Sequence, residues 1–183
     1  NIAVTTYHYI DFFQSYFDSF EPFIDKNLFI IPNTVEKPSL NKNSNLEKDK
    51  FEFFQLGRMD KLGYHQKGFN DVIKSLLYLE KTLSVEMLKK INYTVIGDGD
   101  RRHQFEESIK KLEYIKVSYF KRKKNSEVKK LISKSDVVLM PSRCEGMSMF
   151  ATEALSLGKP FIFTKNNGLR DMIIDGFNGI SIR

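Results

Sequence analysis

The chain has 183 residues, 41% hydrophobic and 13% aromatic, which is enough for one domain with a buried core and part of a second. Its single cysteine, Cys144, excludes an internal disulfide and a cysteine-based zinc cluster, and the three histidines lack ligand spacing, so we expect no metal site. The net charge of +6 fits an anionic nucleotide, a nucleic acid or an acidic membrane surface, and does not choose among them.

No apolar run approaches the roughly 20 residues of a membrane span, and no signal peptide opens the chain, so a cytoplasmic setting is the expectation. The chain begins without methionine and stops at a strand-like segment. We therefore expect it to be a fragment of a longer protein.

Taken in order, the first 33 residues read as a strand at 2–6, an aromatic-rich helix at 9–20 and a strand at 28–31. Residues 37–50 are polar and rich in lysine and asparagine, as is typical of a solvated linker. A domain boundary is expected there.

From Phe51 onward, apolar runs alternate with segments of helical spacing. The expected strands are 51–56, 91–96, 115–120, 137–140, 160–164 and 179–182. The expected helices are 70–83, 101–112, 126–133, one that runs from about 150 to Gly158, and 169–174. This alternation predicts βαβ units and therefore an α/β fold with a doubly wound parallel sheet.

The stretch from Pro141 to Ala154 links the apolar strand 137–140 to the helix after it. Its loop lies at the carboxyl end of the strand, where open α/β sheets bind ligands. Glu145 falls in this loop and Glu153 about two turns into the helix. The first N–H groups of that helix face the same crevice and favour an anion such as phosphate.

Two cations and a pair of glycines stand at other strand ends. Arg58 follows the strand 51–56 and Lys67 precedes the next helix, so both can point into the crevice and hold a diphosphate. The alternative interpretation is two solvated surface cations. Gly97 and Gly99 can be read simply as a tight turn, because glycine supplies positive φ; the alternative, close approach of backbone to a ligand, is what the family resemblance given below implies. The pattern around them is no G-x-G-x-x-G fingerprint, so a dinucleotide cofactor is not supported.

Taken together, these landmarks resemble the retaining glycosyltransferases of family 4, whose signature is E-x7-E, two glutamates separated by seven residues. The landmarks in the family's order are Gly57-Arg58, Lys67-Gly68, Gly97-Asp98-Gly99, Pro141-Ser142, Glu145-Gly146, Glu153-Ala154, Gly168-Leu169 and Asp175-Gly176-Phe177-Asn178-Gly179. The resemblance covers nearly all of residues 51–183 and, more loosely, residues 1–33. It implies the GT-B architecture, in which two Rossmann-like domains face a cleft.

The resemblance also implies a domain plan. Residues 1–33 would be the end of the N-terminal, acceptor-side domain, residues 34–50 the interdomain linker, and residues 51–183 the donor-binding domain, truncated at its C-terminus. The activity implied is transfer of a sugar from a UDP- or GDP-sugar to a glycan or lipid-linked acceptor, with retention of configuration, in cell-surface polysaccharide or glycoconjugate synthesis. No tightly bound cofactor and no nucleic-acid partner are implied. The full-length protein is expected in the cytoplasm, with peripheral association at the inner face of the membrane as an option, and this fragment alone is expected to be inactive.

Residue roles follow from the same resemblance. Arg58 and Lys67 would hold the donor diphosphate, Glu145 would face the donor sugar, and Glu153 would bind the ribose hydroxyls; Glu145, Arg58 and Lys67 are the candidate catalytic residues. The other candidate donor-binding positions are Gly57, Gly97, Gly99, Gly146, Met147, Ser148 and Met149. The chain departs from the family pattern at Thr34 and Lys121, where glycine is common. It also departs at Gly146-Met147-Ser148-Met149, where the family commonly has glycine-phenylalanine-glycine or -proline.

Three other functions are compatible with parts of the pattern. A glycoside hydrolase also uses two carboxylates, although it has no diphosphate for Arg58 and Lys67 to hold. A nucleotide-sugar epimerase shares the two-domain fold and differs in acting on the donor without an acceptor. A non-catalytic basic module for RNA or membrane would use the run 121–124, which reads more simply as a solvated loop.

Overall fold

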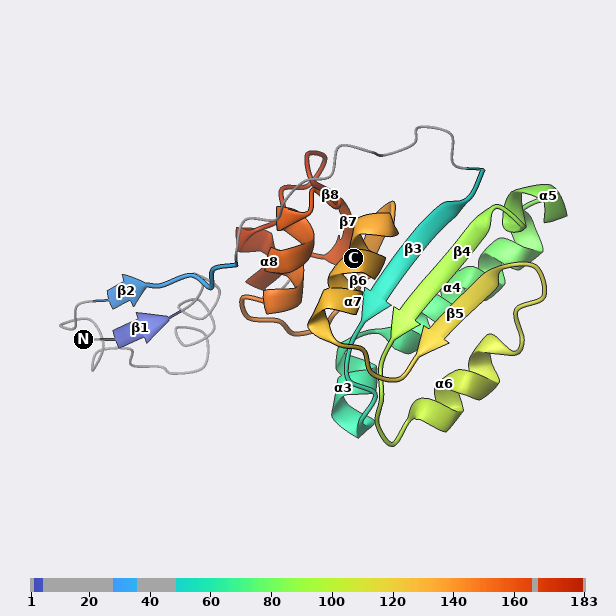
Figure 1. Cartoon of the computed structure of the whole chain (residues 1–183), viewed down its shortest axis with the longest axis horizontal. Coiled ribbons are helices and arrows are strands. Elements are labelled where there is room, and N and C mark those ends of the chain that lie inside the picture. Colours follow the sequence, from blue (N-terminus) through green and yellow to red (C-terminus); the bar gives the residue numbers. More distant parts are fainter. Residues whose placement is uncertain (1, 5–27, 36–48, 166–167, 183) are drawn as a thin grey trace.

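A computed structural model describes residues 2–4, 28–35, 49–165 and 168–182. The described strands form two parallel sheets (Figure 1). Strands β1 (Ile2–Val4) and β2 (Leu28–Ile30) pair only with each other, at the left of the view. The helix predicted at 9–20 lies outside the described residues. The predicted domain boundaries stay predictions.

The larger sheet has six strands in the order β5-β4-β3-β6-β7-β8, all parallel. They are β3 (Phe51–Leu56), β4 (Ile91–Ile96), β5 (Lys116–Phe120), β6 (Val137–Met140), β7 (Phe161–Thr164) and β8 (Gly179–Ile182). The doubly wound parallel α/β sheet predicted from the sequence is confirmed.

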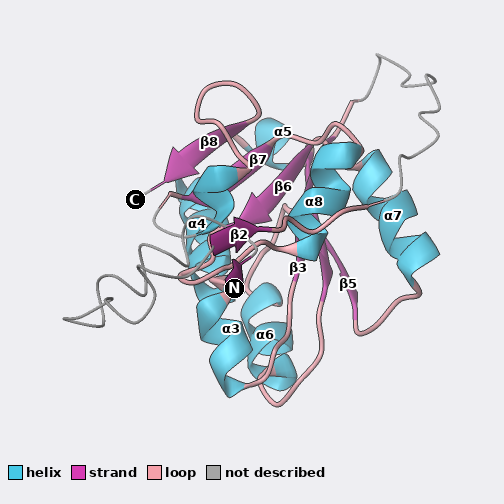
Figure 2. Cartoon of the chain, turned by 90° about the vertical axis from the view of Figure 1, so that its left-hand side faces the viewer, coloured by secondary structure: helices cyan, strands magenta, loops and turns pink. Residues whose placement is uncertain are grey.

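Helices cover the sheet from both sides (Figure 2). They are α3 (Lys61–Gln66), α4 (Phe69–Thr82), α5 (Val85–Leu88), α6 (Arg102–Ile109), α7 (Asn125–Lys134) and α8 (Met149–Ser156), with a 3-10 turn η1 (Gly168–Asp171). Helices α4 and α6 lie on one face, and α7 and α8 lie on the other. Right-handed crossovers produce this division, because the chain runs outward from β3 in opposite directions in its two halves.

The two helical layers enclose two hydrophobic clusters, and each strand contributes alternate residues to them. In β3, Phe54 is buried on the α7 and α8 side, while Phe53 packs on the α4 and α6 side. In β6, Val138 belongs to the first cluster and Leu139 to the second. Because both faces of these central strands are covered, their sequences are largely apolar: β6 is apolar throughout, and β3 includes Glu52 and the buried Gln55.

The structure corrects the element assignment at three places. The helix predicted at 169–174 is only the 3-10 turn η1. It stops there because the Asn178 side chain accepts the Ile174 N–H and donates to the Met172 carbonyl, at 2.6 and 3.2 Å, in place of a further helical turn. Helices α3 and α5 were not predicted.

Among the described residues, no helix combines the length and the apolar character that a membrane span requires.

Candidate functional site

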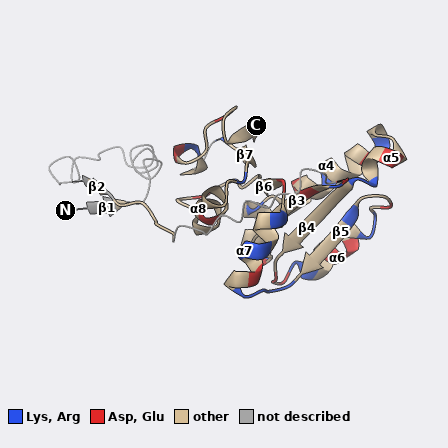
Figure 3. Ribbon diagram, turned by 45° about the horizontal axis from the view of Figure 1, so that its top comes forward, with Lys and Arg blue, Asp and Glu red and all other residues tan. Residues whose placement is uncertain are grey.

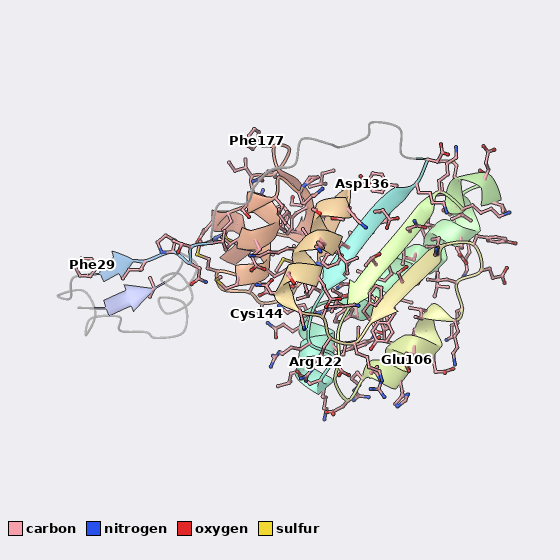
Figure 4. The ribbon with its side chains drawn as sticks, viewed as in Figure 1. Phe29, Glu106, Arg122, Asp136, Cys144 and Phe177 are labelled. Atoms are coloured by element: carbon pink, nitrogen blue, oxygen red, sulfur yellow. The ribbon has the colours of Figure 1, made fainter. Side chains whose placement is uncertain are left out.

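The site is built where the strand order reverses. Strand β3 pairs with β4 on one side and with β6 on the other, so the loops that follow β3 and β6 diverge to opposite faces of the sheet. That divergence is the topological switch point, the usual ligand crevice of an open α/β sheet. Cys144 and Arg122 lie toward this carboxyl edge, whereas Asp136 lies at the opposite end of the strands (Figure 4).

The connection after β3 delivers Lys67 to the crevice through the short helix α3. Asp60 caps this helix by accepting the Gly63 N–H at 2.8 Å, and Lys67 is its C-cap residue. Gly68 then turns the chain into α4 with φ of 68°. A Cβ atom on Gly68 would stand 2.5 Å from the Pro141 carbonyl oxygen, so glycine is what lets the two loops approach each other.

Lys67 and Glu145, one from each loop, meet in an ion pair between Nζ and Oε1. Their side chains are only 18% and 8% exposed, so the pair is largely withdrawn from water. The Gln55 side-chain amide donates to the Lys67 carbonyl at 2.9 Å, and the Glu145 carbonyl accepts the Gly168 N–H at 2.7 Å. Two of the predicted catalytic residues therefore lie in contact, and their backbones are fixed.

A second set of contacts binds the same two loops. Arg143 donates to the His65 carbonyl and to the Asp71 carboxylate, each at 2.7 Å, and its own N–H donates to the Gln66 carbonyl at 2.8 Å. The Gln66 side chain donates to the Cys144 carbonyl at 2.6 Å. The α3–α4 corner and the β6–α8 loop are thus clamped together on either side of Lys67.

Helix α8 begins four residues after Glu145. Ser148 caps the helix, since its hydroxyl accepts the Ala151 N–H at 3.3 Å and its carbonyl accepts the Thr152 N–H at 3.0 Å. The N–H groups of Met149 and Phe150 precede these and have no acceptor within the helix. Such groups, with the positive end of the helix dipole, suit an anion. Asn33 contacts Met147 at this loop, with two hydrogen bonds of 2.9 Å.

Arg58 and Glu153 lie apart from the Lys67–Glu145 pair. The Arg58 side chain is 68% exposed and faces Asp60 at 3.6 Å. The Gly63 N–H and the nearby Arg58 guanidinium hold the pKa of the Asp60 carboxyl below its ordinary value against partial desolvation. Glu153 accepts a 3.3 Å hydrogen bond from the Asn125 side chain of α7. Arg58 is thus solvated, and Glu153 faces α7 rather than Glu145.

The glycines after β4 are packed against protein. A Cβ on Gly97 would stand 2.6 Å from the Gly57 carbonyl oxygen, and one on Gly99 2.3 Å from backbone atoms of Met59 and Asp60. The Met59 N–H donates to the Asp98 carbonyl at 2.9 Å. Asp98 lies between two arginines, Arg102 at 3.6 Å and Arg122 at 3.7 Å. Figure 3 shows Lys and Arg positions in blue on α7 and along the loop between β5 and α7.

Three positioning contacts escaped the sequence analysis: Arg143 with Asp71, Gln66 with Cys144, and Asn33 with Met147. Their partners are 72, 78 and 114 positions apart. The one available signal was that Arg143 and Asn33 each follow a strand end closely. Within the described residues, no three His, Cys, Asp or Glu side chains gather as a metal site would require.

The open parallel sheet with helices on both faces is the Rossmann-like α/β fold found in GT-B-type glycosyltransferases. A model of the family described as glycosyl transferases group 1 matches residues 36–183, and the chain belongs to that family.

Curated relatives agree with this assignment. An uncharacterized glycosyltransferase of Methanocaldococcus jannaschii is 34% identical over 98 residues, which is 52% of this chain and 28% of the relative. An uncharacterized 41.2 kDa protein in the cps region of Klebsiella pneumoniae is 30% identical over 142 residues, 78% of this chain and 35% of the relative. An Escherichia coli UDP-Gal:alpha-D-GlcNAc-diphosphoundecaprenol alpha-1,3-galactosyltransferase is 23% identical over 163 residues, 84% of this chain and 40% of the relative. The chain thus spans between 28% and 40% of the length of these three relatives.

Solved structures share the fold. A variant of TarM from S. aureus has a TM-score of 0.74 at 19% identity, covering 100% of this chain and 34% of that one. The C-terminal domain of the Francisella tularensis glycosyl transferase LpcC has a TM-score of 0.58 at 22% identity, covering 73% of this chain and 67% of that one. At these identities the likeness concerns the fold alone.

Proposed function

We propose that the chain is the donor-binding part of a retaining glycosyltransferase of family 4, of the hexosyltransferase type, which uses a UDP- or GDP-sugar and acts on a glycan or lipid-linked acceptor. The observation that carries the proposal is the Lys67–Glu145 pair at the switch point, beside the start of α8. Glu145 and Glu153 are then the two glutamates of the E-x7-E signature. The whole protein would act in the cytoplasm, at the inner face of the membrane, in polysaccharide or glycoconjugate synthesis.

The geometry suits a leaving diphosphate. As the bond between the anomeric carbon and the diphosphate oxygen breaks, negative charge develops on the diphosphate. The Lys67 ammonium has three N–H donors, so it can hold Glu145 with one and phosphate oxygens with the others. The N–H groups of Met149 and Phe150, which have no acceptor within the helix, add fixed dipoles that need no reorganisation during the reaction. The Arg58 side chain is 68% exposed, so it can swing from Asp60 toward the same diphosphate.

The relatives support this assignment through their own ligands. The TarM structure contains UDP, and an Escherichia coli trehalose-6-phosphate structure of the same fold, with a TM-score of 0.55 at 20% identity, contains UDP-2-fluoro glucose. That structure covers 69% of this chain and 33% of its own. The Escherichia coli galactosyltransferase uses UDP-Gal and a diphosphoundecaprenol-linked acceptor by name.

Calorimetry of this chain with UDP, GDP and ADP tests the donor site. We expect one of them to bind, and Lys67→Ala to weaken it about 10- to 100-fold, since a hydrogen bond to a charged group contributes roughly 1.5–3 kcal/mol. Lys110→Ala is the matched control, because Lys110 pairs with Glu107 on α6, outside the crevice. Equal binding by Lys67→Ala and the wild-type chain would contradict the proposal. Turnover of the donor by the full-length protein without acceptor would favour an epimerase or a hydrolase instead.

The two glutamates should fail differently in the full-length enzyme. Glu153→Gln should mainly raise KM, because contacts to the ribose act equally in the ground state and the transition state. Glu145→Gln should mainly lower kcat, because positive charge grows at the anomeric carbon in the transition state. Parallel loss of activity and of several degrees of Tm in both variants would make the pair structural.

A further inference from the structure

Asn33 reaches the phosphate-facing loop from the far end of the chain. It lies three residues after β2, and the segment that carries it passes beside α8 (Figure 1). Its side-chain amide donates to the Met147 carbonyl and its backbone N–H donates to the Met147 sulfur, each at 2.9 Å. Both residues are half-buried. The contact therefore ties the β1–β2 segment to the loop between Glu145 and α8.

The orientation of the Met147 carbonyl determines the orientation of the peptide that leads into α8. A trans peptide is planar, so its carbonyl and the following N–H point in opposite directions. When Asn33 binds the Met147 carbonyl, it fixes the plane of the Met147–Ser148 peptide, and the Ser148 N–H then points away from Asn33. Ser148 is also the N-cap residue of α8. The orientation of this one peptide therefore sets where the free N–H groups at the start of α8 are presented.

We propose that Asn33 is a positioning residue for the donor diphosphate. It touches no donor atom and acts through Met147, holding the first N–H groups of α8 in place before the ligand arrives. This inference rests on the proposed function. It adds that the β1–β2 segment completes the donor loop, because the tether comes from residue 33 and not from the six-stranded sheet.

The two hydrogen bonds can be removed one at a time. Asn33→Ala removes the bond to the carbonyl and keeps the backbone bond to sulfur. Met147→Leu removes the sulfur and keeps the carbonyl. Since a neutral hydrogen bond contributes about 1 kcal/mol, Asn33→Ala should weaken UDP binding about fivefold in calorimetry. Asn33→Asp should weaken it more, because a carboxylate would face a carbonyl oxygen, and Met147→Leu should weaken it less.

Amide hydrogen exchange supplies a readout that a general loss of stability would not reproduce. Asn33→Ala should speed exchange at 148–152 and leave the amides of β4 and β5 unchanged, with Tm within about a degree of the wild-type value. Thr34→Ala, at the exposed neighbouring position, is the matched control and should change neither binding nor exchange.

The outcomes separate this inference from the proposed function. If the wild-type chain binds UDP, GDP or ADP and Asn33→Ala binds it equally, with unchanged exchange at 148–152, the positioning role is wrong and the donor site stands. If the wild-type chain binds none of the three nucleotides, the proposed function and this inference both fall. If Asn33→Ala speeds exchange throughout the sheet, Asn33 is a general stabiliser and the proposal is overturned.

Discussion

Two loop regions at the same edge of the sheet differ in what fills the space beside them. The loop after β4 is filled with protein, and Gly97 and Gly99 lie where backbone from the β3 loop leaves no room for a side chain. The crevice between the β3 and β6 loops instead holds two opposite charges that are mostly hidden from water. A glycine at a strand end therefore indicates that another group approaches the backbone closely, but this group can be protein as well as ligand. Charges brought from two loops to the switch point are the stronger sign of a ligand site.

The largest expected effect tests the filled loop. Gly99 has φ of 150°, and a Cβ there would overlap the Met59–Asp60 backbone, so Gly99→Ala should cost about 3 kcal/mol of unfolding free energy in urea titrations. Gly158→Ala is the control, because Gly158 has φ of 70° with open space around it. It should cost only about 1 kcal/mol. Equal costs would show that backbone conformation, and not crowding, explains both glycines.

The next effect tests the charged crevice. Lys67→Met leaves the Glu145 carboxylate buried without its partner, and should cost about 2 kcal/mol of unfolding free energy, a buried-pair value reduced for the 18% exposure of Lys67. Glu145→Gln should cost less, because the flexible lysine can reach water. The double variant Lys67→Met/Glu145→Gln should recover part of the loss. If the two losses simply add, the ion pair contributes no coupling.

A smaller effect should come from the clamp around Lys67. Arg143→Ala removes the bond to the His65 carbonyl and the pair with Asp71, and should cost about 0.5–1 kcal/mol because the side chain is 43% exposed. Asp71→Asn weakens only the ion pair and should cost less. Urea unfolding measures both, and nucleotide affinity should fall more in Arg143→Ala than in Asp71→Asn. If Asp71→Asn loses more unfolding free energy than Arg143→Ala, the Arg143–Asp71 ion pair alone holds the two loops together.

The smallest effect comes from a carboxylate bound by protein alone. Glu80 accepts the N–H groups of Glu113, Tyr114 and Ile115 at 2.9–3.0 Å. Desolvation acts to raise the pKa of Glu80, but the three donors outweigh it and leave that pKa below its ordinary value. The group therefore adds stability above its unfolded pKa, and this stability is lost as pH falls through the folded pKa.

Glu80→Gln should cost about 0.5 kcal/mol of unfolding free energy at about pH 7 and less at an acidic pH below the folded pKa of Glu80, since there the wild-type carboxyl is neutral as well. Urea titrations at the two pH values measure the difference. Glu127→Gln is a matched variant at a surface carboxylate. The pKa of Glu127 is also lowered by a backbone N–H, that of Lys124. If the loss of unfolding free energy in Glu80→Gln is the same at low pH, the negative charge of Glu80 does not contribute to the contact.

The sequence predicted what short-range patterns encode. Strand β6 was found because its four residues are all apolar, and β3 because its phenylalanines outweigh Glu52 and Gln55. Lys67 and Glu145 lie beside recognisable elements, but it was the family resemblance that assigned them to the site. Helix α3 was missed because its six residues include Gly63, a poor helix former. The end of η1 was missed because the Asn178 side chain, and not a local pattern, satisfies the backbone there.

The remaining features depend on partners far apart in the chain. Neither Arg143 nor Asp71 is unusual in its own segment, and the pair exists only because β3 and β6 are neighbours. The order of strands in a sheet follows from chirality and packing over the whole chain. Contacts that the order creates between loops cannot be read from either loop alone.

The position of β3 also dictates the order in which the molecule can assemble. Its partner β4 follows within 40 residues, but its partner β6 lies 84 residues further along the chain. During synthesis β3, β4 and β5 can pair first, and one side of β3 stays open until β6 is made. Lys67 likewise has no partner during synthesis until Glu145, 78 residues later, has been made. Any change that delays the docking of β6 prolongs the exposure of an apolar strand edge, which is where aggregation begins.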